Sequence, residues 1–347
     1  MLPDLPLERA GRMPPSHQRG QGRDYGNAQV RAAEVYLVVR VQGVLMTAMN
    51  VKIVQLDGPM MNLALSKLAR HHANKGDKVS FDEPNPDIIY YGAIFDWTVQ
   101  KWRNQSTLGN AKVVVGGYPF NDDQLSSEVD ALMPLYDLWG TDYSMGYTSR
   151  GCIRKCGFCI VPIKEGAIRD YQSVSQFHDP RHKKVILLDN NFFASPKWRE
   201  NLAYINDNGL KVDFTQGLDL RLMTEEMAGQ LASTKLDGQI HFAFDSISEE
   251  PSVRRGLALV ISAGVRPEYI SVYVLVGYDS TWTEDVRRCS VLWDEYKVHP
   301  FVMKYNGKRD DPKLNALARW ANRPAIHRNH SLPDYLASRG LAVGRER

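Results

Sequence analysis

Residues 151–166 read GCIRKCGFCIVPIKEG and hold three of the four cysteines in the chain, Cys152, Cys156 and Cys159. Their spacing is C-x3-C-x2-C, on a loop that begins with glycine and directly follows the strand pattern of YSMGYTSRGC. Three thiolates in one tight loop can hold three irons of a cubane [4Fe-4S] cluster, which then needs a fourth ligand from elsewhere. The spacing therefore predicts an iron–sulfur site with one open iron.

Zinc is the main alternative for these thiols. A structural zinc site usually has four ligands in two pairs, and the chain has no second C-x2-C, so His178 or His182 would have to complete the set. The fourth cysteine, Cys289, lies in the helical pattern RRCSVLWDEY and is expected to be a small buried apolar residue. Three flanking basic residues are expected to help keep the loop thiols ionised: Arg150, Arg154 and Lys155.

Strand and helix patterns alternate through the second half of the chain. Five apolar runs follow the first strand: KVILLDNNF, VDFTQGLDLRL, QIHFAFDS, ISVYVLVGYD and PFVMKYN. Helical patterns such as EEMAGQLAST separate them. Six strand–helix units predict a partial (β/α)6 barrel of TIM type over residues 139–305, with parallel strands. Polar residues follow the strands, and the carboxyl ends of barrel strands are where active sites are built.

A shorter alternation precedes the barrel. The runs VKIVQLDG, DIIYYGAIF and KVVVGGYPF predict a Rossmann-like domain with a parallel sheet over residues 49–138. Residues 1–48 are expected to be a disordered or non-core extension, because their first part is rich in Pro, Gly, Arg and Gln without apolar periodicity. Residues 306–347 form a C-terminal extension in this scheme. The expected fold class is therefore α/β, with two successive domains.

Composition limits the compartment and the partners. The 347 residues are 43% hydrophobic and 24% charged, which is typical of a soluble globular chain. Clustered cysteines and the absence of a secretory pattern favour the reducing cytoplasm. We expect no membrane span, because charged and polar residues interrupt the apolar run of residues 32–49. The net charge of +3 does not by itself indicate a nucleic-acid partner. The basic residues between 150 and 184 and in RWANRPAIHRNH are nevertheless compatible with a nucleic-acid substrate.

With Phe158 before the last cysteine, the C-x3-C-x2-C loop resembles the signature of radical S-adenosylmethionine enzymes. The strand repeat resembles their partial barrel. The resemblance implies that the amino and carboxylate groups of S-adenosylmethionine chelate the open iron, and that one electron cleaves the sulfonium to a 5'-deoxyadenosyl radical. It further implies hydrogen abstraction from an unidentified substrate, and a low-potential electron donor such as flavodoxin or ferredoxin.

The resemblance also implies where S-adenosylmethionine binds. In the family a Gly-Gly-Glu-like segment after the second strand binds the methionine amino group; Asp189 and Asn190 occupy that place here, and the glycines are absent. The segment VYVLVGYD resembles the strand that packs along adenine, which implies backbone contacts from Val276 and Gly277.

Three polar residues complete the candidate S-adenosylmethionine site. Arg221 is expected to pair with a carboxylate, and Asp245 or Ser246 to reach the ribose. A purely structural role is an equal alternative for each. A different class of function is a non-catalytic metal-binding or nucleic-acid-binding protein that keeps the cysteine loop for structure.

The upstream domain resembles the cobalamin-binding-like domain that often precedes such barrels. Its usual lower-ligand motif, Asp-x-His-x-x-Gly, is missing, because the chain reads DGPMMNLAL after the first strand. His71 and His72 lie a helix later and are expected to be surface or packing residues. Cobalamin binding is thus expected to be lost or altered, and a cobalamin-dependent radical methyltransferase remains an alternative.

A nucleic-acid-modifying enzyme is the other alternative among enzymes. GCIRKCGFCIVP resembles the cluster loop of the related methylthiotransferases. Those enzymes carry three further cysteines upstream for an auxiliary cluster, and residues 1–151 here contain none. Sulfur insertion of that type is therefore not expected.

Overall fold

The computed structural model describes residues 48–95, 98–99, 111–117, 120, 123–305 and 310–341. They belong to two compact units, which meet in the sequence between Thr141 and Asp142. The expected N-terminal extension, residues 1–48, lies outside the described residues except for Ala48. Within the described ranges, no helix is long and apolar enough to cross a membrane.

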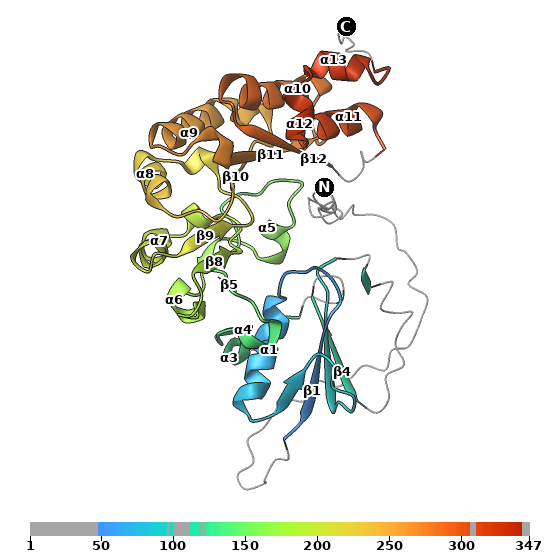
Figure 1. Ribbon diagram of the computed structural model, residues 1–347, viewed down its shortest axis with the longest axis vertical. Helices are drawn as coiled ribbons and strands as arrows, with labels where there is room; N and C mark the ends of the chain where they lie inside the picture. Colours follow the sequence, from blue (N-terminus) through green and yellow to red (C-terminus); the bar gives the residue numbers. More distant parts are fainter. Residues whose placement is uncertain are drawn as a thin grey trace. The chain divides into compact units, whose positions relative to one another are not determined.

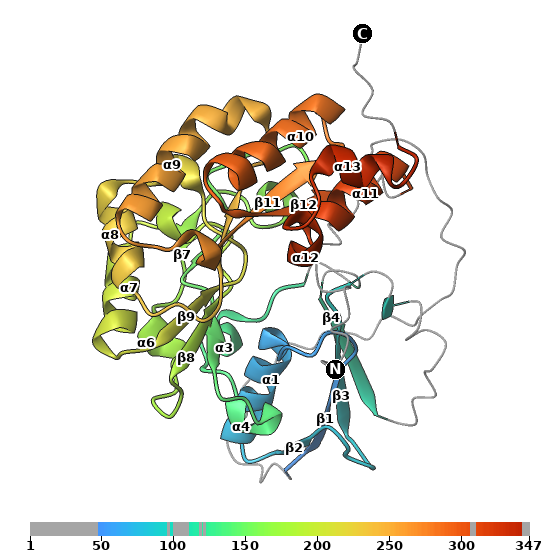
Figure 2. The same cartoon turned by 45° about the horizontal axis from the view of Figure 1, so that its top comes forward.

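The upstream unit is a four-stranded parallel sheet with the strand order β2-β1-β3-β4. Its described helices lie along one side of the sheet (Figures 1 and 2). The elements are β1 (Asn50–Gln55), α1 (Leu63–Asn74), β2 (Lys78–Ser80), β3 (Ile88–Gly92), β4 (Lys112–Gly116), α3 (Ser127–Asp130) and α4 (Tyr136–Trp139). The parallel sheet predicted for this part of the chain is confirmed.

Helix α1 shows why this unit folds. The Asn62 side chain caps the helix by accepting the backbone N–H of Leu65 at 3.1 Å, and Gly76, with a φ of 84°, follows its end. Leu65 and Ala69 lie on one face and are buried with Ile53 of β1. Burying a leucine or isoleucine side chain contributes about 1.5–3 kcal/mol, so this face attaches the helix to the sheet.

The downstream unit contains six parallel strands that alternate with helices (Figure 1). The strands are β5 (Ser144–Gly146), β8 (Lys184–Leu187), β9 (Lys211–Phe214), β10 (Ile240–Ala243), β11 (Ile270–Val276) and β12 (His299–Lys304). The helices are α5 (Val161–Lys164), α6 (Val174–Phe177), α7 (Trp198–Asp207), α8 (Glu225–Ser233), α9 (Glu250–Ser262), α10 (Trp282–Ser290), α11 (Pro312–Ala321), α12 (Pro324–His327) and α13 (Leu332–Ala337).

The predicted α/β class with parallel strands is confirmed, but the strands do not pair as one barrel wall. They form two sheets, β5-β8-β9 and β10-β11-β12. Two isolated bridges connect these sheets. Val212 of β9 pairs with Leu236, which precedes β10, and Leu218, which follows β9, pairs with Phe242 of β10. Burial alternates along β10, where Ile240 and Phe242 belong to the core and His241 faces the other side.

The first predicted strand, YSMGYTSRGC, is two short strands. After β5 the chain forms β6 (Ser149–Arg150), which pairs antiparallel with β7 (Arg169–Asp170). The break has a physical cause, because the carboxylate of Asp189 accepts the backbone N–H groups of Thr148 and Ser149 at 2.9 and 2.6 Å. Those N–H groups are then not available to a parallel ladder.

The C-terminal helices belong to the same hydrophobic core as the strands. Leu317, Trp320 and Leu336 are buried in that core, and the side chain of Asn322 bonds both the N–H and the C=O of Val302 in β12. These bonds satisfy backbone groups of the last strand. Trp320 is 5% exposed, so it offers no stacking surface for a nucleic acid.

The pattern TEDVRRCSVLWDEY forms α10 followed by one π-helical turn, Val291–Glu295. Thr281 and Glu284 start α10 with a capping box, in which each side chain bonds the other residue's backbone N–H. Cys289 is fully buried in this helix. The prediction that it is a core residue is confirmed.

Candidate functional site

The cysteine loop is closed at its base. The backbone N–H of Cys152 donates to the carbonyl of Gly166 at 3.2 Å, and that of Gly151 donates to the carboxylate of Glu165 at 2.8 Å. Gly151 has a φ of 81°, and a Cβ there would lie 2.3 Å from the carbonyl oxygen of Ala167. The loop therefore needs its initial glycine.

Glu165 attaches this loop to the barrel strands. One carboxylate oxygen accepts from Arg150 Nε at 2.9 Å, from the Gly151 N–H at 2.8 Å and from Asn190 Nδ2 at 3.0 Å. Asn190 follows β8, so one carboxylate joins the start of the loop to the end of a strand. No sequence pattern marked Glu165, because its partner Asn190 lies 25 residues away.

The three thiols lie on this one loop. Cys152, Cys156 and Cys159 are each partly buried, and the backbone N–H of Arg154 donates to Cys152 Sγ at 3.3 Å. In the part of the chain that the structure describes, no group of three His, Cys, Asp or Glu side chains is arranged to hold a metal ion. As a donor set, three thiols on one anchored loop fit a [4Fe-4S] cluster, which takes cysteine ligands.

Burial controls the ionisation of two of these thiols. It raises the pKa of Cys156 and Cys159, and the charge of Arg221 opposes that effect only for Cys156. The help that the flanking basic residues are expected to give stays a prediction. Two of those residues are paired with carboxylates, Arg150 with Glu165 and Arg154 with Asp219.

Asp189 is buried and its carboxylate is fully engaged within the chain. It accepts four hydrogen bonds, from the backbone N–H and the hydroxyl of both Thr148 and Ser149, at 2.6 to 2.9 Å. Burial raises its pKa, and these hydrogen bonds oppose that effect. In the structure Asp189 thus anchors the end of β8 to the chain that leads into the cysteine loop.

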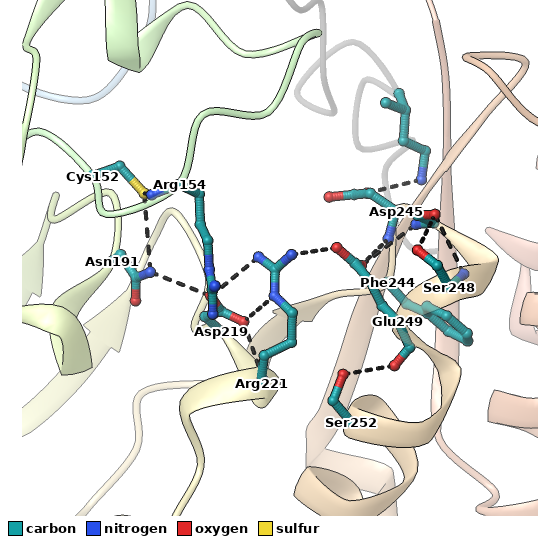
Figure 3. A network of polar contacts seen from close by, with 12 residues as sticks. Cys152, Arg154, Asn191, Asp219, Arg221, Phe244, Asp245, Ser248, Glu249 and Ser252 are labelled. Carbon is teal, nitrogen blue, oxygen red and sulfur yellow. Dashed lines mark hydrogen bonds and ion pairs between the residues drawn. The ribbon is translucent and has the colours of Figure 1, made fainter.

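A series of polar contacts runs from the cysteine loop to the end of β10 (Figure 3). Arg154 Nε donates to the Asp219 carboxylate at 2.9 Å, Arg221 Nε donates to it at 2.6 Å, and Arg221 also pairs with Glu249. Burial favours a raised pKa for Asp219, but the hydrogen bonds from the two arginines outweigh it and hold the pKa below its usual value. Asp219 therefore remains an anion that holds two cations.

Asp245 follows β10 at the other end of this series. It is partly buried, and it accepts the backbone N–H of Leu275 at 3.2 Å. Burial and the nearby charge of Glu249 raise its pKa to about 6. Ser246 is exposed and caps the short turn Ile247–Glu249, while Glu249 accepts the N–H groups of both Asp245 and Ser246.

The residues expected along adenine lie at the end of β11. Val276 is fully buried, and the N–H of Gly277 donates to the Asp285 carboxylate at 3.2 Å. The ring of Phe158 packs edge-on against Tyr278, with 5.4 Å between the ring centroids. An aromatic contact thus joins the cysteine loop to the residue after Gly277.

The structure brings together only part of the predicted set. The charges of Arg221 and Asp245 both act on Cys156, whereas Asp189, Ser246 and Gly277 are engaged by neighbours in the chain. Sequence reasoning did not assign four residues that organise this region: Glu165, Asn191, Asp219 and Tyr278. Three of them follow barrel strands, which was the signal available in the sequence.

In the upstream unit, the loop after β1 is held by Gln55. Its Nε2 donates to the carbonyls of Asp57, Gly58 and Met60 at 2.7 to 3.1 Å. Its Oε1 accepts the backbone N–H of Asn62 at 2.9 Å. An open cavity of about 420 Å³ lies beside this loop, and the described residues that line it include Gly58 but no histidine.

The polar side chains near this loop form hydrogen bonds to other residues of the same unit. The Asp57 carboxylate accepts the N–H of Ile94 at 2.9 and 3.0 Å. His72 is buried, with Nδ1 2.7 Å from Asp77 and Nε2 2.9 Å from the Tyr90 hydroxyl. The packing role expected for His72 is confirmed, and neither of its ring nitrogens is available to a cobalt ion.

No family model matches the chain, and no curated protein matches it. Among solved structures, one with a similar fold is the cobalamin-dependent S-adenosylmethionine radical enzyme OxsB with aqua-cobalamin and S-adenosylmethionine bound. The TM-score is 0.50 and the sequence identity is 13%. The match covers 84% of this chain and 57% of that chain. The same enzyme with aqua-cobalamin bound gives 0.49 and 12%, covering 84% and 58%. This chain thus spans less than two thirds of OxsB. The first likeness shows that this chain shares the fold of the matched part of OxsB.

Proposed function

We propose that this chain is a radical S-adenosylmethionine enzyme that reductively cleaves S-adenosylmethionine to start radical chemistry on a substrate. The observation that carries the proposal is the C-x3-C-x2-C loop, closed at its base and joined by Glu165 to the end of a barrel strand. In parallel α/β barrels, chemistry is built at that edge of the strands. The shared fold with OxsB supports the same conclusion.

Three cysteines, Cys152, Cys156 and Cys159, would hold the [4Fe-4S] cluster and leave one iron without a protein ligand. When bound, the cluster supplies the electron for cleavage of S-adenosylmethionine. The chain's own contribution is to anchor the loop through Glu165, and to place the guanidinium of Arg221 within electrostatic reach of Cys156. A cation there stabilises an anionic cluster.

The S-adenosylmethionine contacts expected at Asn190, Arg221, Asp245, Val276 and Gly277 belong to this proposal. Asp245 lies just after the end of β10, and its carboxylate can accept hydrogen bonds from ribose hydroxyls. For Asp189, Ser246 and Phe158 we propose that the effect on S-adenosylmethionine is indirect, through the loop and turn that they support.

The test is anaerobic reconstitution with iron and sulfide. We expect about four irons and four sulfides per chain, and formation of 5'-deoxyadenosine when dithionite and S-adenosylmethionine are added. A non-catalytic metal-binding or nucleic-acid-binding protein, the alternative class, would bind metal or nucleic acid without forming 5'-deoxyadenosine. A chain that takes up one zinc and no sulfide would contradict the proposal.

We further propose a cytoplasmic setting, in which a flavodoxin- or ferredoxin-type donor delivers the low-potential electron. Lys155 is an exposed cation in the loop, and positive charge there would attract an acidic electron donor. The substrate class stays open between small molecules and nucleic acids, and a comparison of metabolites and modified nucleosides with and without the gene addresses it.

A second candidate function is a cobalamin-dependent radical reaction, which the shared fold with cobalamin-dependent OxsB favours. The residues present do not fit coordination of cobalt through a protein histidine, because the loop after β1 has none and His72 is engaged by Asp77 and Tyr90. We therefore propose that the upstream domain keeps the fold without a histidine-coordinated corrinoid.

The cobalamin proposal predicts a negative binding result. After incubation with hydroxocobalamin and gel filtration, the visible spectrum of the protein fraction should show far less than one corrinoid per chain. The same experiment on the chain with all three loop cysteines replaced by alanine checks that any retention does not depend on free thiols. Retention of one corrinoid per chain in both would contradict the proposal and place a cobalamin-dependent methyl transfer first among the candidate reactions.

A further inference from the structure

Asn191 occupies an unusual place beside the cysteine loop. It stands at the start of the short turn η2 (Phe192–Ala194), where asparagine is among the best capping residues, yet its side chain makes no capping hydrogen bond. The amide instead lies between Cys152 and Asp219 (Figure 3). Its Nδ2 is 4.0 Å from Cys152 Sγ and 3.5 Å from Asp219 Oδ2.

The orientation of this amide follows from its neighbours. A carboxylate and a thiolate both accept hydrogen bonds, so they select the NH2 end of the Asn191 side chain. Asn191 is 3% exposed, and its Oδ1 is buried without a hydrogen-bond partner among the described residues. An unsatisfied buried acceptor is unfavourable for the folded chain. Stability of the chain alone does not explain why the amide is held here.

Asp219 directs a second donor to the same sulfur. The backbone N–H of Arg154 donates to Cys152 Sγ at 3.3 Å, and the side chain of Arg154 is tied to Asp219 at 2.9 Å. Asp219 is itself buried and fixed by Arg221. Among the described residues, the Asp219 carboxylate thus contacts the side chains of the two residues whose N–H groups face Cys152.

We propose that Asn191 is a positioning residue that tunes the cluster, an inference that rests on the proposed function. Its Nδ2–H donates to the Cys152 sulfur when that sulfur is a cluster ligand, and Asp219 holds the amide in place. A hydrogen bond to a ligand sulfur stabilises the reduced, more negative cluster, so it raises the reduction potential. The reduction potential is the quantity that a merely structural role of Asn191 would not change.

The experiment is a redox titration of the reconstituted protein, followed by the electron paramagnetic resonance signal of the reduced cluster. Asn191→Leu keeps the size but removes the donor, and should shift the midpoint to a more negative potential. Asn191→Asp adds a negative charge and should shift it further. Asn191→Gln retains a donor and should stay closest to the wild type.

Asn208→Leu is the matched control, because the Asn208 amide is exposed and donates to the Tyr204 carbonyl at the end of α7; its midpoint should equal that of the wild type. An unchanged midpoint in Asn191→Leu overturns the inference. If that variant fails to hold iron, the Asp and Gln variants decide, and equal midpoints for those two overturn it. A wild-type chain without a cluster refutes the proposed function itself.

Discussion

Replacing Cys152, Cys156 or Cys159 with alanine will reduce the iron content of the reconstituted protein from about four per chain to almost none, and will abolish 5'-deoxyadenosine formation. The reason is that a cubane held by only three thiolates loses the protein ligand of one of its irons when any one of them is removed. Iron and sulfide analysis, together with the visible absorption of the cluster, measures the loss.

Cys289→Ala is the control for this prediction. Cys289 is fully buried in α10 and its thiol has a pKa of about 12, raised by burial. Its replacement deletes one core atom, at a cost of about 1 kcal/mol in stability, and should leave the irons and the cleavage activity in place. Full iron content in any of the three loop variants would show that the loop is not the cluster site.

Asp189→Ala will lower the free energy of unfolding by about 3–5 kcal/mol. The carboxylate is buried and accepts four hydrogen bonds from Thr148 and Ser149. Without it, two backbone N–H groups and two hydroxyls lose their acceptor where water does not replace it. Urea denaturation of the cluster-free protein, followed by circular dichroism, measures the change independently of S-adenosylmethionine.

Two further substitutions sharpen the Asp189 test. Asp189→Asn keeps the shape and one acceptor oxygen, so its loss of stability should lie between those of the wild type and Asp189→Ala. Asp207→Ala removes an exposed carboxylate in α7 and should change the stability by less than about 0.5 kcal/mol. A stability loss for Asp189→Ala as small as that of Asp207→Ala would mean that the carboxylate does not anchor the strands.

The network in Figure 3 shows why the contacts between site residues could not be predicted from the sequence. Arg154 and Asp219 are 65 residues apart, and Arg221 and Glu249 are 28 apart. Arg221 was expected at the site, but no pattern in the sequence paired it with Glu249 or paired Arg154 with Asp219. They meet because successive parallel strands deliver their carboxyl ends to one edge, a consequence of strand order that no local pattern encodes.

The sequence by itself determined the six strands, their α/β alternation and the loop that holds the three thiols. Apolar runs must be buried, the chain between them must return as helix to keep strands parallel, and Gly151 permits the backbone turn that closes the loop. Local spacing is sufficient for these features because each depends on residues close in sequence.

Only the tertiary structure decided what the polar strand-end residues do. Asp189 was expected to face a ligand and instead bonds Thr148 and Ser149, about 40 residues away. Asn191 follows the same strand, had no predicted role, and lies beside Cys152. A carboxylate or an amide has the same appearance in sequence whether its partner is a cofactor or the backbone. Its partner is fixed by burial and strand register, which bring together groups that are far apart in the chain.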